Sequence, residues 1–170
     1  MGKKKGDGNI LMTDKWTTPK WLYEQLNKEF QFDYDPCPID YDKSFDGRET
    51  EWGARNYVNP PYKELESWLK KGHEEYKKDK LVCFLLPVYS DTDWFHEYIP
   101  KANELRFIKE RIRCGDCTEH ARFPAPFPSC VAIFIPDSMT LTRGVKIGEQ
   151  TRENGKEYWT KGCEHYECMF

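Results

Sequence analysis

Two segments of the chain are almost entirely hydrophobic. Residues 80–88, KLVCFLLPV, are rich in β-forming residues and stop at a proline, and residues 129–136, SCVAIFIP, show the same pattern. Strands without polar alternation are typical of a sheet that is covered on both faces. We therefore expect both segments to be buried strands, the first of them central.

Three shorter segments are also predicted to be strands. Residues 30–38, FQFDYDPCP, alternate aromatic and polar residues and end in carboxylates and a proline turn. Residues 55–61, RNYVNPP, end at two prolines, which cannot donate to a β-ladder. Residues 104–114, ELRFIKERIRC, alternate apolar positions with charges, which predicts a strand with one solvated, charged face.

Helical spacing occurs between these strands. A helix is predicted to open at Thr18-Pro19 and to run to Phe30, because proline suits the first helical turn. Residues 63–79 are predicted to be a helix with one apolar side, formed by Leu65, Trp68, Leu69, His73 and Tyr76. Residues 91–102 are predicted to form a short helix, and residues 39–55 a polar loop. Helices between apolar strands predict an α/β domain.

Composition limits the kinds of partner. The chain has 170 residues, a net charge of −3 and 15% aromatic residues. This charge argues against tight non-specific binding of nucleic acid, although a local basic patch remains compatible with it. The aromatic residues supply core area and stacking surface for a planar ligand.

The ends of the chain differ from its middle. Residues 1–14 are predicted to be a disordered basic leader and 137–170 a polar extension of a domain over 15–136. No apolar run is long enough to span a membrane, so we expect a cytoplasmic protein. The seven cysteines are an odd number, which favours reduced thiols over a disulfide framework.

Polar residues follow two of the predicted strands. Asp33 and Asp35 close the first, and Asn59-Pro60-Pro61-Tyr62 closes the second. In open α/β sheets ligands bind beyond the carboxyl ends of the strands, so parallel neighbours would bring both groups to one crevice.

The prolines after Asn59 fix two acceptors, the amide oxygen of Asn59 and the carbonyl of Pro60. Two acceptors suit an exocyclic NH2 group, which has two hydrogens to donate, and Tyr62 could stack on the ring that carries it. The simpler alternative is that Asn-Pro-Pro only ends a strand and begins a turn.

The motif and its surroundings resemble the small phage and prophage DNA N6-adenine methyltransferases of the Dam type. The resemblance rests on "KWTTPKWL" (15–22), "FDYDPCP" (32–38), "NYVNPPY" (56–62), "FLLPVYSDTDWF" (84–95), "FIKERIR" (107–113) and "APFPSCVAIF" (125–134). It implies a compact Rossmann-like S-adenosylmethionine-dependent methyltransferase sheet flanked by helices. The implied substrate is double-stranded DNA.

The resemblance also implies roles for particular residues. Asn59, Pro60, Pro61 and Tyr62 would be catalytic. The S-adenosylmethionine-binding residues would be Trp16, Thr18, Pro19, Asp33, Asp35, Pro36 and Asn59. The glycine-rich turn expected after the acidic cofactor residue is missing, so Asp33 competes with Asp35 for that role. Thr18-Pro19 could equally be a structural helix start.

DNA contact is predicted for a basic cluster, Arg106, Lys109, Arg111 and Arg113. The alternative is a solvated strand face balanced by Glu104 and Glu110. Methyl transfer from a sulfonium needs no metal, so none is expected at the active site. A structural zinc site is a separate possibility, although its spacing matches no complete motif. The candidate ligands are Cys114, Cys117, His120, Cys163, His165 and Cys168.

The sequence thus predicts a DNA adenine methyltransferase of unknown oligomeric state. The same motif would suit an amino-methyltransferase acting on RNA adenine or a protein glutamine. A catalytically inactive nucleic-acid-binding module is the third interpretation, favoured by the glycine-poor cofactor region and opposed by the intact Asn-Pro-Pro-Tyr.

Overall fold

A four-stranded mixed sheet forms the centre of the computed structural model, which describes residues 17–38, 44–113 and 124–139. The strands are β1 (Arg55–Val58), β2 (Leu81–Pro87), β3 (Glu104–Phe107) and β4 (Ser129–Phe134), and their spatial order is β1-β2-β4-β3. β1 and β2 run parallel, whereas β4 is antiparallel to both β2 and β3. The carboxyl ends of β1 and β2 and the start of β4 therefore share one edge of the sheet.

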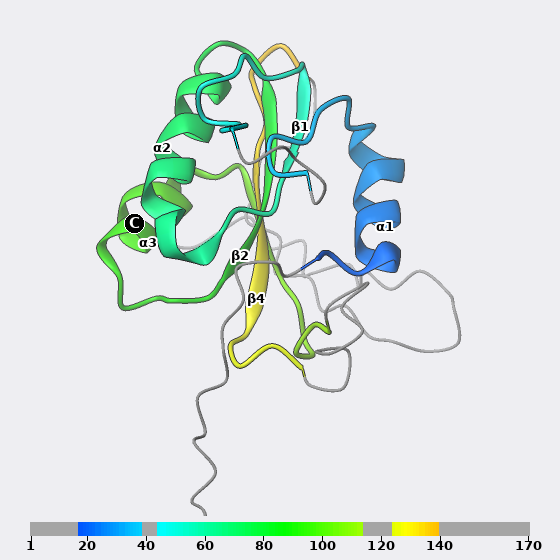
Figure 1. The fold of residues 1–170 in the computed structure, drawn as a ribbon, viewed down its shortest axis with the longest axis vertical. Coiled ribbons are helices and arrows are strands. Elements are labelled where there is room, and N and C mark those ends of the chain that lie inside the picture. The colour runs from blue at the N-terminus through cyan, green and yellow to red at the C-terminus, as the bar shows by residue number, and fades with distance from the viewer. Residues whose placement is uncertain (1–16, 39–43, 114–123, 140–170) are drawn as a thin grey trace, which may run out of the picture.

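Helices cover both faces of this sheet. α1 (Lys20–Phe30) lies on one face, while α2 (Leu65–Tyr76) and α3 (Asp93–Tyr98) lie on the other (Figure 1). Two 3-10 turns complete the set, η1 (Tyr62–Glu64) before α2 and η2 (Ile99–Lys101) after α3. None of the helices in the described ranges is long and apolar enough to cross a membrane.

Each residue of β2 and β4 is buried, which confirms the prediction for both apolar segments. Alternate side chains of β2 enter opposite cores: Leu81, Cys83 and Leu85 pack in the cluster with α1, and Val82, Phe84 and Leu86 in the cluster with α2. Full burial of one such side chain contributes about 2 kcal/mol. Continuous hydrophobicity is therefore what a strand between two helical layers requires.

The segment 31–38 differs from its prediction as a strand, because it makes only an isolated parallel bridge between Tyr34 and Asn56. Gln31 adopts the left-handed conformation that ends α1, with φ of 53°. The carboxylate of Asp33 accepts the N–H groups of Ala54 and Arg55, and the Asp33 N–H donates to the carbonyl of Arg55. The predicted parallel alignment with β1 is nevertheless confirmed by this bridge.

The prediction of a solvated charged face on residues 104–114 is wrong for the strand itself. β3 spans only four residues, in which Glu104 and Arg106 are buried while Leu105 and Phe107 are half-buried. The Arg106 guanidinium donates to Glu104 at 2.6 Å and to both carboxylate oxygens of Glu29 in α1 at 2.6 and 2.7 Å. Charged side chains occupy this buried position because they neutralise one another there.

The end of α2 is anchored by a second buried charge. Glu75 is fully buried and pairs with Lys71, Lys78 and Lys80 at 2.7–2.9 Å. These bonds lower the pKa of Glu75 to about 2, although burial opposes the shift. Lys80 also donates to the carbonyl of Trp52. The cluster therefore ties the end of the helix to the loop that leads into β1.

Candidate functional site

The predicted meeting of two chain segments is found at the carboxyl edge of the sheet. The Tyr57 N–H donates to the carbonyl of Tyr34, so Asp33–Asp35 runs beside β1 as the latter approaches Asn59. At the neighbouring strand ends, the N–H of Val88 donates to the carbonyl of Pro128. The Asn59–Tyr62 motif therefore emerges beside the acidic segment, at an edge that β2 and β4 also reach.

The amide of Asn59 is held by a residue far away in the sequence. Its Nδ2 donates to Thr18 Oγ1 at 3.2 Å, and Thr18 Oγ1 lies 2.7 Å from the hydroxyl of Tyr57. Thr18 precedes α1, and Tyr57 lies in β1 two residues before Asn59. One hydroxyl thus connects the start of α1 to the motif.

Tyr57 is a site residue that the sequence analysis missed. Its side chain is buried against Tyr23 and Phe32, with ring centroids 5.1 and 5.4 Å away. Burial raises the pKa of Tyr57 well above its usual range, and the bond to Thr18 offsets this only in part. The phenol therefore stays neutral near pH 7. The sequence offered one signal for it: Tyr57 lies two residues before Asn59, and residues two apart on a strand share a face.

The two candidate aspartates have different environments. Asp33 is exposed, and its carboxylate accepts the N–H groups of Ala54 and Arg55 at 3.2 and 2.9 Å. Asp35 is half-buried, and burial raises its pKa to about 6 against the opposing effect of the Cys37 N–H bond. Its charge also helps raise the pKa of Tyr23. Asp33 therefore has a structural task in the observed conformation, whereas Asp35 lies close enough to Tyr23 and Tyr57 for its charge to contribute to the raised pKa of both.

A row of aromatic rings starts at the motif. Tyr62 meets Phe127 edge-to-face at 5.0 Å, Phe127 meets Tyr89 at 5.6 Å, and Tyr89 meets Trp94 at 6.4 Å. These residues come from three separate parts of the chain, so sequence spacing could not have revealed the row. The contacts fix the ring of Tyr62 from the β4 side, and burial raises its pKa.

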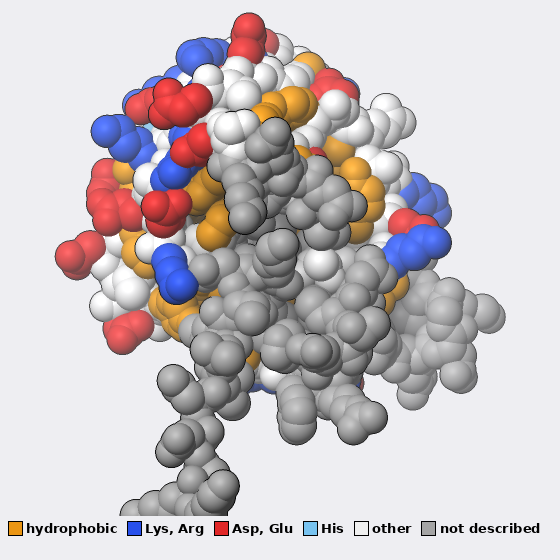
Figure 2. All heavy atoms as spheres, viewed as in Figure 1, with side chains coloured by type: hydrophobic (Ala, Val, Ile, Leu, Met, Phe, Trp, Pro, Cys, Tyr) orange, Lys and Arg blue, Asp and Glu red, His pale blue; other side chains and the backbone are white. Residues whose placement is uncertain are grey.

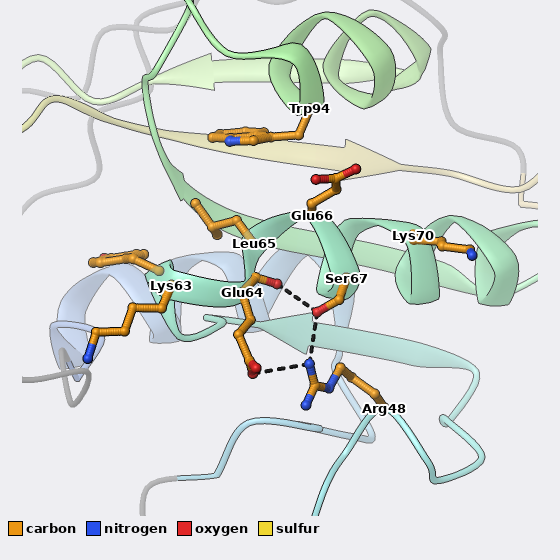
Figure 3. Close-up of a pocket in the computed structure, with 9 residues that line it drawn as sticks. Arg48, Lys63, Glu64, Leu65, Glu66, Ser67, Lys70 and Trp94 are labelled. Carbon is orange, nitrogen blue, oxygen red and sulfur yellow. Dashed lines mark hydrogen bonds and ion pairs between the residues drawn. The ribbon is translucent and has the colours of Figure 1, made fainter.

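A cleft of about 550 Å³ opens beside Tyr62, between α2 and α3. Trp94 lies across it from Leu65 and Glu66, and Lys70 lies further along α2 (Figure 3). At its rim the Arg48 guanidinium donates to Ser67 at 2.8 Å and pairs with Glu64 at 3.1 Å. The volume falls in the range of small-molecule pockets and is large enough for a nucleotide.

A family model described as "DNA N-6-adenine-methyltransferase (Dam)" matches residues 9–138. The chain belongs to this family. It is 29% identical over 121 residues to "DNA N-6-adenine-methyltransferase" of Escherichia phage T1, an alignment that covers 64% of this chain and 51% of that protein.

A second Dam-family relative comes from another phage. The chain is 30% identical over 107 residues to "DNA N-6-adenine-methyltransferase" of Haemophilus phage HP1 (strain HP1c1), covering 56% of this chain and 62% of that protein. The predicted resemblance to phage proteins of the Dam type is thereby confirmed. The chain spans about half of the first relative and about three-fifths of the second.

The basic cluster predicted for DNA contact divides into two environments in this Dam-family chain. Arg106 is enclosed by Glu104 and Glu29 and lies over the ring of Phe30, which argues for a structural role. The remaining members are exposed on a segment that pairs with residues 124–129 beyond the end of β3; they are Lys109, Arg111 and Arg113. This extension lies at the sheet edge that carries Asn59.

The surface around α2 and α3 carries charges of both signs (Figure 2). On the side where α2 and α3 lie, acidic and basic side chains alternate (Figure 2). Among the described residues, no cluster of histidine, cysteine and carboxylate side chains is arranged to hold a metal ion. Trp16 and the six predicted zinc ligands, from Cys114 to Cys168, lie outside the described residues.

Proposed function

We propose that this chain transfers a methyl group from S-adenosylmethionine to the N6 amino group of adenine in double-stranded DNA. The observation that carries the proposal is the Asn59 amide, held by Thr18 at the carboxyl end of β1 beside the half-buried Asp35. Family membership supports the reaction type. We interpret the sheet with helices on both faces as the compact core of a Rossmann-like methyltransferase fold.

The raised pKa of Asp35 provides a test of whether the site fits this cofactor. Its carboxyl is desolvated, and in the described structure only the Cys37 N–H offsets that burial. Hydroxyl donors from a ribose would stabilise the carboxylate further, so the residue fits the sugar of S-adenosylmethionine. Thr18, Pro19 and Pro36 remain predicted neighbours of the cofactor.

The cofactor, when bound, supplies a methyl group already activated on a positively charged sulfur. The chain's own task is to present the amine nitrogen to it. An adenine amine is a poor nucleophile because its lone pair is delocalised into the ring. Acceptors at Asn59 and at the Pro60 carbonyl would draw the two N–H bonds toward them and stabilise the positive charge that develops on nitrogen. Pro61 contributes by restricting the backbone.

The target base must leave the duplex to reach this edge. We place it on the ring of Tyr62, on the side of the cleft that Trp94 closes. Phe127 supports the Tyr62 ring edge-on, which keeps the tyrosine from turning away when the base is absent. Stacking on aromatic rings contributes about 1–3 kcal/mol per base.

The duplex itself would be held by phosphate contacts. Lys109, Arg111 and Arg113 are exposed on the segment that extends β3 toward the catalytic edge. Arg111 also donates to the carbonyl of Ala125, which limits its motion without enclosing its charge. We propose these three residues as the phosphate contacts and leave Arg106 to the ion-pair cluster.

Transfer of a radiolabelled methyl group to defined substrates tests the proposal. Purified protein is incubated with labelled S-adenosylmethionine and, separately, duplex DNA, RNA or a protein extract, and the products are digested to nucleosides or amino acids. We expect label in N6-methyl-2′-deoxyadenosine from the DNA digest and no labelled product from RNA or protein. Label in RNA adenine or in protein glutamine would change the assigned substrate from DNA to RNA or protein. Cofactor binding without methyl transfer to DNA, RNA or protein would favour an inactive binding module.

A further inference from the structure

Three side chains from separate segments are joined through one oxygen atom. Thr18 Oγ1 accepts a hydrogen bond from Asn59 Nδ2 at 3.2 Å and lies 2.7 Å from the Tyr57 hydroxyl. Thr18 and Asn59 are half-buried, and Tyr57 is 2% exposed. In such a part-buried setting polar groups are usually hydrogen-bonded, and here the two hydroxyl groups and the amide partner one another.

An asparagine at this position needs to be oriented. Its amide carries an acceptor at one end and two donors at the other, and the two ends have almost the same shape. A half-turn of the amide would point its NH2 group at the substrate amine, so that donors would face donors. A fixed acceptor on the non-substrate side selects the productive orientation, because it binds the NH2 end.

We propose that Thr18 and Tyr57 are positioning residues that hold the Asn59 amide with its oxygen toward the substrate amine. The inference rests on the proposed methyl transfer. Thr18 supplies the acceptor for Asn59 Nδ2, and Tyr57 fixes the rotation of the Thr18 side chain through the 2.7 Å bond. Neither residue touches the reacting atoms in this account.

The setting of Tyr57 suits this role. Two aromatic neighbours, Tyr23 and Phe32, hold its ring, and their centroids lie 5.1 and 5.4 Å from it. Its hydroxyl is therefore held in place by a strand of the sheet, whereas Thr18 precedes the first turn of α1. When Thr18 donates its proton to the Tyr57 oxygen, Thr18 Oγ1 can only accept from Asn59, and a neutral phenol is able to accept in this way.

The sequence resemblance assigns Thr18 a different task, contact with the cofactor. The two roles differ in what they predict. A cofactor contact acts on cofactor affinity, so its loss is overcome by raising the cofactor concentration. A positioning residue acts on the rate at saturating cofactor, and its effect passes through Asn59.

Single-turnover methyl transfer to duplex DNA at saturating cofactor separates these roles. We expect Thr18→Val to slow transfer about tenfold and Tyr57→Phe about threefold to tenfold, as for loss of one hydrogen bond. Thr18→Ser restores the hydroxyl and should stay within about twofold of wild type. The dissociation constant for S-adenosylmethionine, measured by calorimetry, should change less than about twofold in each.

Tyr34→Phe is a matched control. It removes a hydroxyl that lies 2.8 Å from Thr50 Oγ1, another part-buried tyrosine–threonine bond on the segment beside β1, with no link to Asn59. It should affect thermal stability about as much as Tyr57→Phe and leave the transfer rate unchanged. Because Tyr57→Phe removes a single oxygen, it keeps the test available if Thr18→Val fails to fold.

A double-mutant cycle with Asn59→Ala then decides the matter. If Thr18 acts through the amide, adding Thr18→Val to Asn59→Ala should slow transfer no further. A further tenfold loss in that background, or a loss that excess cofactor abolishes, would overturn the proposal. Absence of transfer to DNA by the wild type would instead refute the proposed function, so the two failures are distinguishable.

Discussion

Replacing Asp35 with asparagine separates two effects of its carboxylate. One is the loss of folding stability caused by burying the charge, and the other is the proposed contact with S-adenosylmethionine. Asparagine has nearly the same shape and keeps an oxygen that can accept the Cys37 N–H bond, which is 2.8 Å long in the wild type. The variant therefore removes the charge with little change in packing. We expect a more stable apo-protein that binds S-adenosylmethionine more weakly.

The size of the stability effect follows from the pKa. Burial raises the pKa of Asp35 from an ordinary 3.8 to about 6, so the folded protein holds this proton more tightly than the unfolded chain. The stability that this group contributes is complete below pH 3.8 and is lost as the pH rises through about 6. The difference corresponds to about 3 kcal/mol, which solvent screening of a half-buried group reduces to about 1–2 kcal/mol.

Urea unfolding of the apo-protein at several pH values measures this effect. At pH 8 Asp35→Asn should be about 1–2 kcal/mol more stable than wild type, or a few degrees higher in Tm, and the gap should close toward pH 4. Cofactor affinity should fall at least about tenfold, because charged hydrogen bonds are lost.

Asp33→Asn provides the comparison that decides between the two aspartates. Its carboxylate binds the N–H groups of Ala54 and Arg55, so we expect loss of stability with unchanged cofactor affinity. An Asp35→Asn protein that is less stable than wild type at pH 8 and binds cofactor normally would refute the reasoning. Loss of affinity in Asp33→Asn alone would move the cofactor contact to Asp33.

Other regions give further predictions. Glu75→Gln should lower the free energy of unfolding at pH 7 by about 2–3 kcal/mol, because the pKa of Glu75 is lowered from 4.5 to about 2 in the folded protein. Urea titrations should show this difference between variant and wild type vanish as the pH falls from 4.5 toward 2. Arg111→Ala should weaken duplex binding and reduce its salt slope by about one, whereas Arg106→Met should destabilise the fold without changing that slope in anisotropy titrations. Trp94→Ala should weaken binding of DNA about tenfold but leave calorimetric cofactor affinity intact; equal DNA affinity would remove the cleft from the substrate site.

Hydrophobic patterning predicted most of the central architecture. The segments 80–88 and 129–136 became β2 and β4 because continuous apolar runs have a single favourable place, between two covering layers. α1 was also expected, since Pro19 directly precedes its first residue. Local chemistry was sufficient for these elements.

The sequence-based predictions were wrong at positions whose environment depends on a side-chain partner elsewhere in the chain. Arg106 was expected in solvent because charged and apolar residues alternate along its segment, yet Glu29, 77 residues away, supplies the charge that allows its burial. The segment 31–38 makes only one bridge with β1, and the Asp33 carboxylate adds bonds to the N–H groups of Ala54 and Arg55. Both outcomes depend on partners that are distant in sequence.

The motif at Asn59 was recognisable from its own residues, whereas the contacts that hold it were not. Tyr57 and Thr18 are ordinary residues of a strand and a helix start until folding brings them within hydrogen-bond distance. The aromatic contact of Tyr62 with Phe127 likewise joins residues far apart in sequence.

The measurement that tests the central claim most directly is single-turnover methyl transfer to DNA by Asn59→Ala, with cofactor affinity measured separately. Losing one acceptor for the charge that grows on the amine should raise the barrier by about 3 kcal/mol, a loss of roughly a hundredfold in rate. Cofactor affinity should stay within about twofold, because Asp35 and not Asn59 is the proposed main contact. Near-normal transfer by a folded Asn59→Ala protein would contradict the account, and residues 59–62 would then only end a strand and begin a turn.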